Sequence, residues 1–218
     1  MNMQKVRSFT GAFGLAIVVL NWVMFPLYFV GGNSIVLTRV FLDLLECTCF
    51  LVFAVGLRSL ICRARSDYEW VGTLTMVACI ALSTVTLVAA SLEGGTALDT
   101  MGGKADPIVV RALTEGTILI YLSIGCLLIA LFSAAAAYAT LGTGILPKWT
   151  AWIAYATAIL NLVAVPLGFS TAAAAIIAVV IIADFPLQIW VLIVSILMMR
   201  SPETRAKVIH KQELEEVL

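Results

Sequence analysis

Residues 171–199 read TAAAAIIAVVIIADFPLQIWVLIVSILMM, an apolar run in which Asp184 is the only charged side chain. A helix needs about 20 mostly apolar residues to cross the roughly 30 Å of hydrocarbon in a bilayer. The run therefore predicts a membrane-spanning helix that carries a carboxyl group. Five similar runs precede it, and together they predict an all-α bundle of about six transmembrane helices at residues 9–31, 35–58, 70–92, 108–139, 149–168 and 171–199.

The composition of the whole chain supports this reading. Of its 218 residues, 62% are hydrophobic and 12% are charged, whereas soluble domains are about half apolar and about a quarter charged. Basic and acidic residues cancel to a net charge of +0, so the chain carries no excess charge for a polyanion such as nucleic acid. Membrane lipid is the partner that we expect.

Lysine and arginine are distributed unevenly between the two ends of the predicted spans. With a cytoplasmic N-terminus, only Lys104 and Arg111 lie outside, and Arg39 lies within a span. The remaining ten are cytoplasmic: Lys5, Arg7, Arg58, Arg63, Arg65, Lys148, Arg200, Arg205, Lys207 and Lys211. This positive-inside bias predicts that both termini are cytoplasmic.

The chain divides into a six-span domain at residues 1–199 and a tail at residues 200–218. The tail is charged on most turns, and Ser201-Pro202-Glu203 has the pattern of a helix start. We expect a short cytoplasmic helix there.

Two of the predicted spans share a motif. Residues 20–29 read LNWVMFPLYF and residues 160–169 read LNLVAVPLGF, with six of ten positions identical. Each proline removes a backbone donor and should kink its helix, and each asparagine needs a hydrogen-bonding partner inside the bundle. Kinked helices with polar cross-links are the favoured interpretation, and a paired ligand site or coincidence are the alternatives.

Span two carries three charged residues on one helical face: Arg39, Asp43 and Glu46. An Arg or Asp at mid-membrane costs about 2.5–3.5 kcal/mol on insertion scales, so such groups turn inward and find partners. Arg39 and Asp43 are spaced to pair within their helix. Glu46 has no equally close cation.

Polar residues of other spans fall at a similar depth. If they all face the bundle interior, they form a pocket that opens towards the outside. The candidate ligand- or ion-binding residues are Asn21, Arg39, Asp43, Glu46, Glu115, Asn161, Asp184 and Gln188. For Arg39, Asp43, Arg111 and Glu115, a structural or solvated role is the favoured alternative.

Among the charged residues at this depth, with Arg111 included, carboxyl groups outnumber basic groups by two. Asp43, Glu46, Glu115 and Asp184 face only Arg39 and Arg111. We therefore expect that Glu46 or Asp184 holds a proton at neutral pH, or that the pocket holds a cation.

Several activities lack the residues that they need. The only histidine, His210, lies in the tail, so the usual haem and zinc sites cannot be built. Five cysteines without CxxC spacing predict no disulfide framework. We predict no catalytic residue, metal or cofactor, although a site around Cys47, Asp43 and Glu46 remains an alternative.

Two short motifs carry a resemblance. Ile145-Leu146-Pro147-Lys148-Trp149 opens span five, and Phe185-Pro186-Leu187-Gln188-Ile189-Trp190 lies in the last span. Here the chain resembles a bacterial family of six-span integral membrane proteins of unknown function. The resemblance implies a six-helix bundle in a bacterial cytoplasmic (inner) membrane and no particular activity. Family members often have an acid where this chain has Ile189.

The favoured function is a membrane binding protein for a small molecule or ion, or a small proton- or cation-coupled transporter. Arg39, Asp43 and Glu46 would form one wall of its pocket, facing residues of spans one, five and six. Two alternatives are an intramembrane enzyme that acts on a lipophilic substrate with Glu46 or Asp184 as general acid, and an accessory or sensor subunit of a membrane complex. Six spans are few for a transporter, so a homodimer or a membrane-protein partner is expected.

Overall fold

The computed structural model describes residues 3–103, 106–169 and 180–200. The long helices are α1 (Met3–Met24), α2 (Asn33–Ala64), α3 (Glu69–Met101), α4 (Pro107–Leu119), α5 (Cys126–Thr143), α6 (Lys148–Ala164) and α8 (Phe185–Met199). Short 3-10 helices are η1 (Phe25–Phe29), η2 (Ser66–Tyr68) and η4 (Val165–Phe169), and short π-helices are η3 (Ile120–Gly125) and η5 (Val180–Asp184). These elements form six helices long and apolar enough to cross a membrane. The predicted all-α six-span bundle is confirmed.

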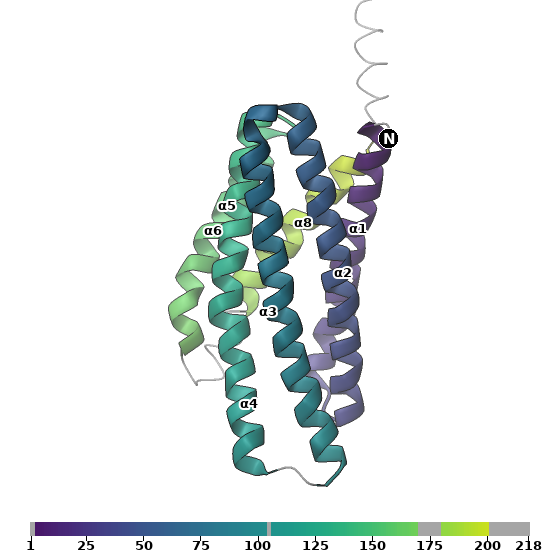
Figure 1. The fold of residues 1–218 in the computed structure, drawn as a ribbon, viewed down its shortest axis with the longest axis vertical. Coiled ribbons are helices and arrows are strands. Elements are labelled where there is room, and N and C mark those ends of the chain that lie inside the picture. The colour runs from purple at the N-terminus through teal and green to yellow at the C-terminus, as the bar shows by residue number, and fades with distance from the viewer. Residues whose placement is uncertain (1–2, 104–105, 170–179, 201–218) are drawn as a thin grey trace, which may run out of the picture.

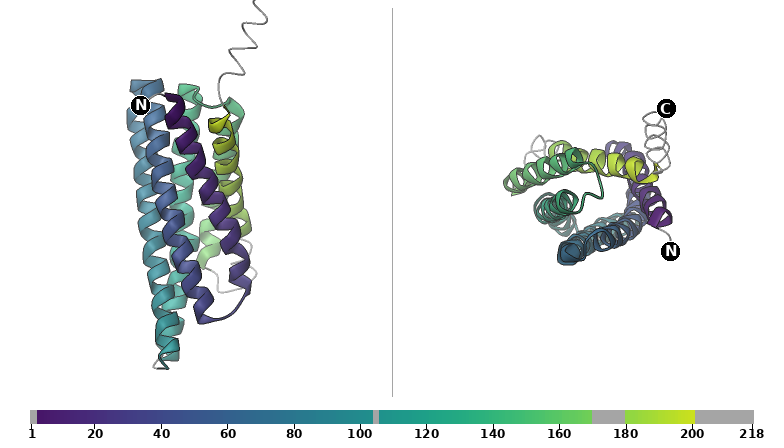
Figure 2. Two further views of the ribbon diagram at one scale, coloured as in Figure 1. Left: turned by 90° about the vertical axis from the view of Figure 1, so that its right-hand side faces the viewer. Right: turned by 90° about the horizontal axis from the view of Figure 1, so that it is seen from above.

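The six spans pack as a closed ring (Figure 1; Figure 2, right). Each span contacts the next one along the chain, and α8 returns to contact α1. The start of α1 lies at the same end of the bundle as the α2–α3 connection and the end of α8 (Figure 1). We call this the terminal end, and the other, where α3 connects to α4, the distal end.

Several predicted span boundaries differ from the structure: α1 begins at Met3 rather than residue 9, and α2 continues to Ala64 rather than residue 58. Residues 93–106 were expected to form a loop, but α3 continues to Met101 and keeps Glu93 inside the helix. A Cβ on Gly94 would lie 3.5 Å from Val40 of α2, so α2 and α3 still touch at this level. Packing against α2 therefore outweighs the low helix propensity of the two glycines. Span four was predicted at residues 108–139 and ends slightly later, at Thr143, with α4, η3 and α5 forming one continuous span.

Parts of two predictions lie outside the described residues. These are the first residues of the last span, 171–179, and the charged tail helix from residue 201 onwards.

The core lies in the terminal half of the bundle. Phe132 of α5 and Trp190 of α8 are fully buried, with ring centroids 6.0 Å apart. Phe50 of α2 packs on Phe132 from the other side, at 5.1 Å. The Trp190 indole donates a 3.0 Å hydrogen bond to the backbone oxygen of Thr150, which ties α8 to α6. Here the ring of helices is filled by side chains.

Small residues let α1 approach its neighbours. A Cβ on Gly11 would lie 2.7 Å from the backbone oxygen of Ser195 in α8, and one on Gly56 of α2 would collide with Thr10. Lipid tails are as apolar as the side chains, so packing of this kind, rather than the hydrophobic effect, drives helix association in a membrane.

The shared motif of spans one and five has the same backbone in both places. The α-helix ends three residues after the asparagine, at Met24 and at Ala164, and a 3-10 helix with the proline follows. Each proline thus coincides with a change of helix type, because it supplies no N–H for the next α-helical bond.

The helix contact at Gly11 gives a stability prediction. Gly11→Ala should lower the unfolding free energy by about 1–3 kcal/mol, the usual cost of an overpacked site, because α1 and α8 must separate. Thermal unfolding of the purified protein in detergent measures this. Gly116→Ala is the matched control, since a Cβ there meets nothing within 4 Å. An equal effect of both substitutions would contradict the close contact.

Candidate functional site

A cavity of about 670 Å³ lies in the distal half of the bundle. Its described lining comes from every span except the one that contains α6. The polar lining residues are Asn21, Tyr28, Asp43, Glu46, Cys47, Ser83, Thr86, Glu93, Thr96, Thr114, Thr117, Tyr121, Cys126, Asp184 and Gln188. The remaining wall is mostly aliphatic and aromatic, so the cavity combines an apolar surface with several carboxyl groups.

Five of the eight residues predicted for the pocket line this cavity, namely Asn21, Asp43, Glu46, Asp184 and Gln188. Residues of spans one, two and six therefore line one cavity. The other three residues, Arg39, Asn161 and Glu115, are not part of the lining.

Glu46 of α2 and Asp184 of η5 lie on either side of Gln188. The Gln188 side-chain nitrogen is 3.5 Å from Glu46 Oε1 and 3.5 Å from Asp184 Oδ1. Asn21 of α1 is also in hydrogen-bonding position to both carboxyl groups. Two carboxyl groups from separate spans thus share two amide side chains.

Asp184 owes its place to an irregular stretch of backbone. It ends η5, a π-helix, and Pro186 follows in the first turn of α8. A π-turn inserts extra backbone into an α-helix and is frequent at functional sites. Span four has a second π-helix, η3, which brings Tyr121 to the cavity.

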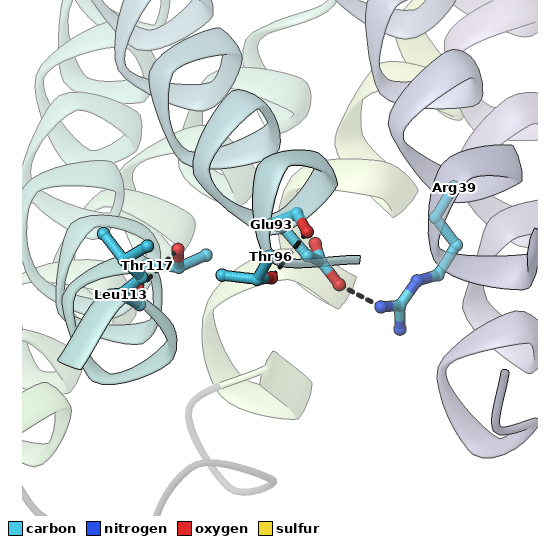
Figure 3. Close-up of polar contacts among 5 residues, drawn as sticks. All are labelled: Arg39, Glu93, Thr96, Leu113 and Thr117. Atoms are coloured by element: carbon cyan, nitrogen blue, oxygen red, sulfur yellow. Dashed lines mark hydrogen bonds and ion pairs between the residues drawn. The ribbon is translucent and has the colours of Figure 1, made fainter. Parts of the chain in front are cut away.

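Arg39 lies beside the cavity and contacts two of its lining residues. Its guanidinium donates to Glu93 of α3 (Figure 3). It also lies 4.2 Å from the ring centre of Tyr28. Only 10% of the Arg39 side chain and 19% of the Glu93 side chain are exposed. Arg39 was expected to pair with Asp43 in its own helix. The structure pairs it with Glu93 instead, because α3 extends far enough to present that carboxylate.

Threonine hydroxyls near this ion pair are used within their own helices. Thr96 donates to the Glu93 backbone oxygen and Thr117 to that of Leu113 (Figure 3). Both side chains line the cavity while their hydrogens are engaged, which leaves their oxygens able to accept.

Asn161 and Glu115 do not line the cavity, and each has hydrogen-bond partners elsewhere. Asn161 is fully buried and donates 3.0 Å hydrogen bonds to the backbone oxygens of Thr157 and Ala183, which join α6 to η5. Glu115 is an exposed residue of α4 and accepts a 2.8 Å bond from Arg111 Nε. One residue cross-links two spans, and the other belongs to a surface pair.

Sequence reasoning missed Glu93, Tyr28 and Tyr121. Glu93 precedes Gly94-Gly95, which reads as the start of a loop. The apolar Ala97 lies four residues after Glu93, which is a helical spacing, and could have indicated that the helix continues. The two tyrosines carry no sequence signal that separates them from ordinary interfacial aromatic residues.

Four polar atoms in the lining are buried without a hydrogen-bond partner among the described residues: Asp43 Oδ2, Ser83 Oγ, the Tyr121 hydroxyl and Gln188 Oε1. Asp43, Ser83 and Gln188 are each at least nine-tenths buried. A buried polar group without a partner costs about 1–3 kcal/mol, and more if it is charged. These atoms therefore have hydrogen-bonding capacity that no described residue uses.

Cys47 uses its thiol for a structural contact. Its sulfur lies 3.9 Å from the backbone oxygen of Ser83 in the neighbouring helix. In the parts of the chain that the structure describes, no group of three or more His, Cys, Asp or Glu side chains is placed to hold a metal ion.

No protein-family model matches the chain, and no similar protein was found among curated proteins or solved structures.

The Arg39–Glu93 ion pair gives a second stability prediction. Arg39→Met should lower the unfolding free energy by about 3 kcal/mol, because it leaves a buried carboxylate without its partner. The double variant Arg39→Met/Glu93→Gln should recover most of this loss. Detergent-induced unfolding followed by circular dichroism measures both.

Arg111→Met is the control for this experiment. It removes the arginine of an ion pair that is exposed on α4 and should leave the unfolding midpoint nearly unchanged. A double variant no more stable than Arg39→Met would show that the two side chains are not coupled.

Proposed function

We propose that this protein is a membrane binding protein or small transporter that takes a small molecule or ion into the distal cavity. The observation that carries the proposal is the meeting of Asp43, Glu46 and Asp184, from two separate spans, in one cavity. Carboxyl groups at membrane depth are costly, and in membrane proteins they typically mark substrate or ion pathways.

The contrast with other buried polar groups supports a binding role. Asn161 and Trp190 have hydrogen-bond partners and join helices. Asn161 Oδ1 also has no partner among the described residues, but Asn161 does not line the cavity, whereas the unpartnered oxygens of Asp43 and Gln188 belong to residues that do. A volume of about 670 Å³ also falls within the roughly 300–1,000 Å³ that is common for ligand pockets.

The balance of charge favours a proton or a cation. The cavity lining contains the four carboxyl groups of Asp43, Glu46, Glu93 and Asp184, and the neighbouring Arg39 forms an ion pair with Glu93. Three carboxyl groups remain, and each must hold a proton or face a positive charge to avoid the cost of a buried anion. If a bound cation replaced the proton on one of these carboxyl groups, cation binding would be coupled to proton release.

The membrane and the orientation follow from the basic residues and the resemblance. Arg58, Arg63 and Arg65 all lie near the α2–α3 connection at the terminal end. The positive-inside rule then gives cytoplasmic termini, and the resemblance to bacterial six-span proteins suggests the inner membrane. The cavity would lie in the outer half of the bilayer.

Native mass spectrometry of the purified protein tests the binding role. We expect a retained small molecule or ion, and Glu46→Gln or Asp184→Asn should lower its occupancy because each removes an ionisable carboxyl group from the lining. Glu69→Gln is the control, since Glu69 is an exposed residue near the terminal end. Co-purification of a second protein in stoichiometric amount, with both variants stable and functional, would instead favour an accessory subunit.

Reporter fusions test the orientation. A green fluorescent protein fused after Leu218 should fluoresce, and an alkaline phosphatase inserted after Gly103 should be active, because these reporters work on opposite sides of a bacterial inner membrane. The reverse pattern would place the cavity in the cytoplasmic half.

A further inference from the structure

The ligand of the distal cavity can be narrowed by chemical class; this inference rests on the proposed function. Charge gives the first restriction. The described lining residues include four carboxyl groups and no Lys, Arg or His. Arg39, which lies nearby, is held between Glu93 and the Tyr28 ring. An anionic ligand would face several carboxyl groups and no free cation of the lining, whereas a positively charged ligand would supply the counter-charge that the ionised carboxyl groups lack, so the charge of the lining favours a cation.

Hydrogen bonding gives the second restriction. The unpartnered Gln188 oxygen is a hydrogen-bond acceptor, and the unpartnered Asp43 oxygen is also only an acceptor when Asp43 is ionised. The hydroxyls of Ser83 and Tyr121 can accept hydrogen bonds as well. A matching ligand brings donors. A primary or secondary ammonium group has two or three N–H donors, whereas a quaternary ammonium group has none.

Size and the apolar wall give the third restriction. A volume of about 670 Å³ is many times the roughly 30 Å³ that one water molecule occupies, so a bare inorganic ion would leave the cavity unfilled. Phe25, Phe29 and Phe50 line it together with aliphatic side chains such as Leu187 and Val191. Aromatic rings of this kind pack well, edge to face, against another ring.

Asp43 is the best placed anchor. It is 4% exposed, and its Oδ2 atom has no hydrogen-bond partner among the described residues. Glu46 and Asp184 already share Gln188 and Asn21, and Glu93 is paired with Arg39. We propose that the cavity binds a protonated primary or secondary amine with an aromatic or branched apolar body, and that Asp43 accepts a hydrogen bond from its ammonium group.

Calorimetry on the full chain in lipid nanodiscs tests this with four matched probes. These are 2-phenylethylamine, its N,N,N-trimethyl derivative, 2-phenylethanol and 3-phenylpropanoate. The primary amine should bind roughly tenfold or more tightly than each of the others, because only it offers both positive charge and N–H donors.

Two variants test the anchor. Asp43→Asn should weaken binding of 2-phenylethylamine roughly tenfold or more, while Asp67→Asn, which changes an exposed carboxylate at the α2–α3 connection, should have no effect. Tyr121→Phe removes only a hydroxyl and serves as a second variant if Asp43→Asn does not fold. It should weaken the primary amine and leave the trimethyl derivative unchanged.

The outcomes separate the ligand class from the binding role. Equal affinity for all four probes, or preference for the carboxylate or the alcohol, would overturn the amine assignment. A retained anionic or neutral molecule in native mass spectrometry would also overturn it, yet leave the binding role intact. If neither a probe nor any retained molecule binds, both proposals fail.

Discussion

Hydrocarbon offers no hydrogen-bond partner, and this constraint governs where each polar side chain of the bundle lies. Thr10 and Thr75 return their hydroxyls to their own helices, and the Trp190 indole reaches a backbone oxygen across a helix interface. Arg39 reaches across from α2 to Glu93 of α3. Some buried polar atoms outside the cavity lining, such as Asn161 Oδ1, also have no partner among the described residues. The unpartnered oxygens of Asp43 and Gln188 differ because their residues line the cavity, and they are the basis for a binding role.

The two halves of the bundle differ in helix packing and helix geometry. In the terminal half, small residues such as Gly11 and Gly56 bring helices together, and the rings of Phe132 and Trp190 fill the interior. In the distal half, spans one, four, five and six each depart from α-helical geometry, through η1, η3, η4 and η5. These departures change the direction in which side chains point, and they occur at the level of the cavity. The closely packed terminal half fixes one end of the helices that surround the cavity in the distal half.

The spans could be predicted because apolar run length is a direct physical requirement of the bilayer. The meeting of Glu46 with Asp184 and Gln188 could be proposed for a related reason, since deep polar groups must face inward. Helix rotation could not be predicted, so Asn21 and Asn161 looked equivalent in sequence, yet one lines the cavity and the other cross-links α6 to η5. Glu93 was missed because local glycine propensity pointed to a loop, whereas contact with α2 extends the helix.

The ring closes between its first and last members, and this has a consequence for biogenesis. Arg39 and Glu93 lie on consecutive spans, so they can meet early, as the chain leaves the ribosome and enters the insertion machinery. Glu46 must wait for Gln188, 142 positions further along the chain. During synthesis the Glu46 carboxyl group therefore enters the bilayer before Gln188 has been synthesised. Until translation ends, this carboxyl group must be protonated or in contact with water.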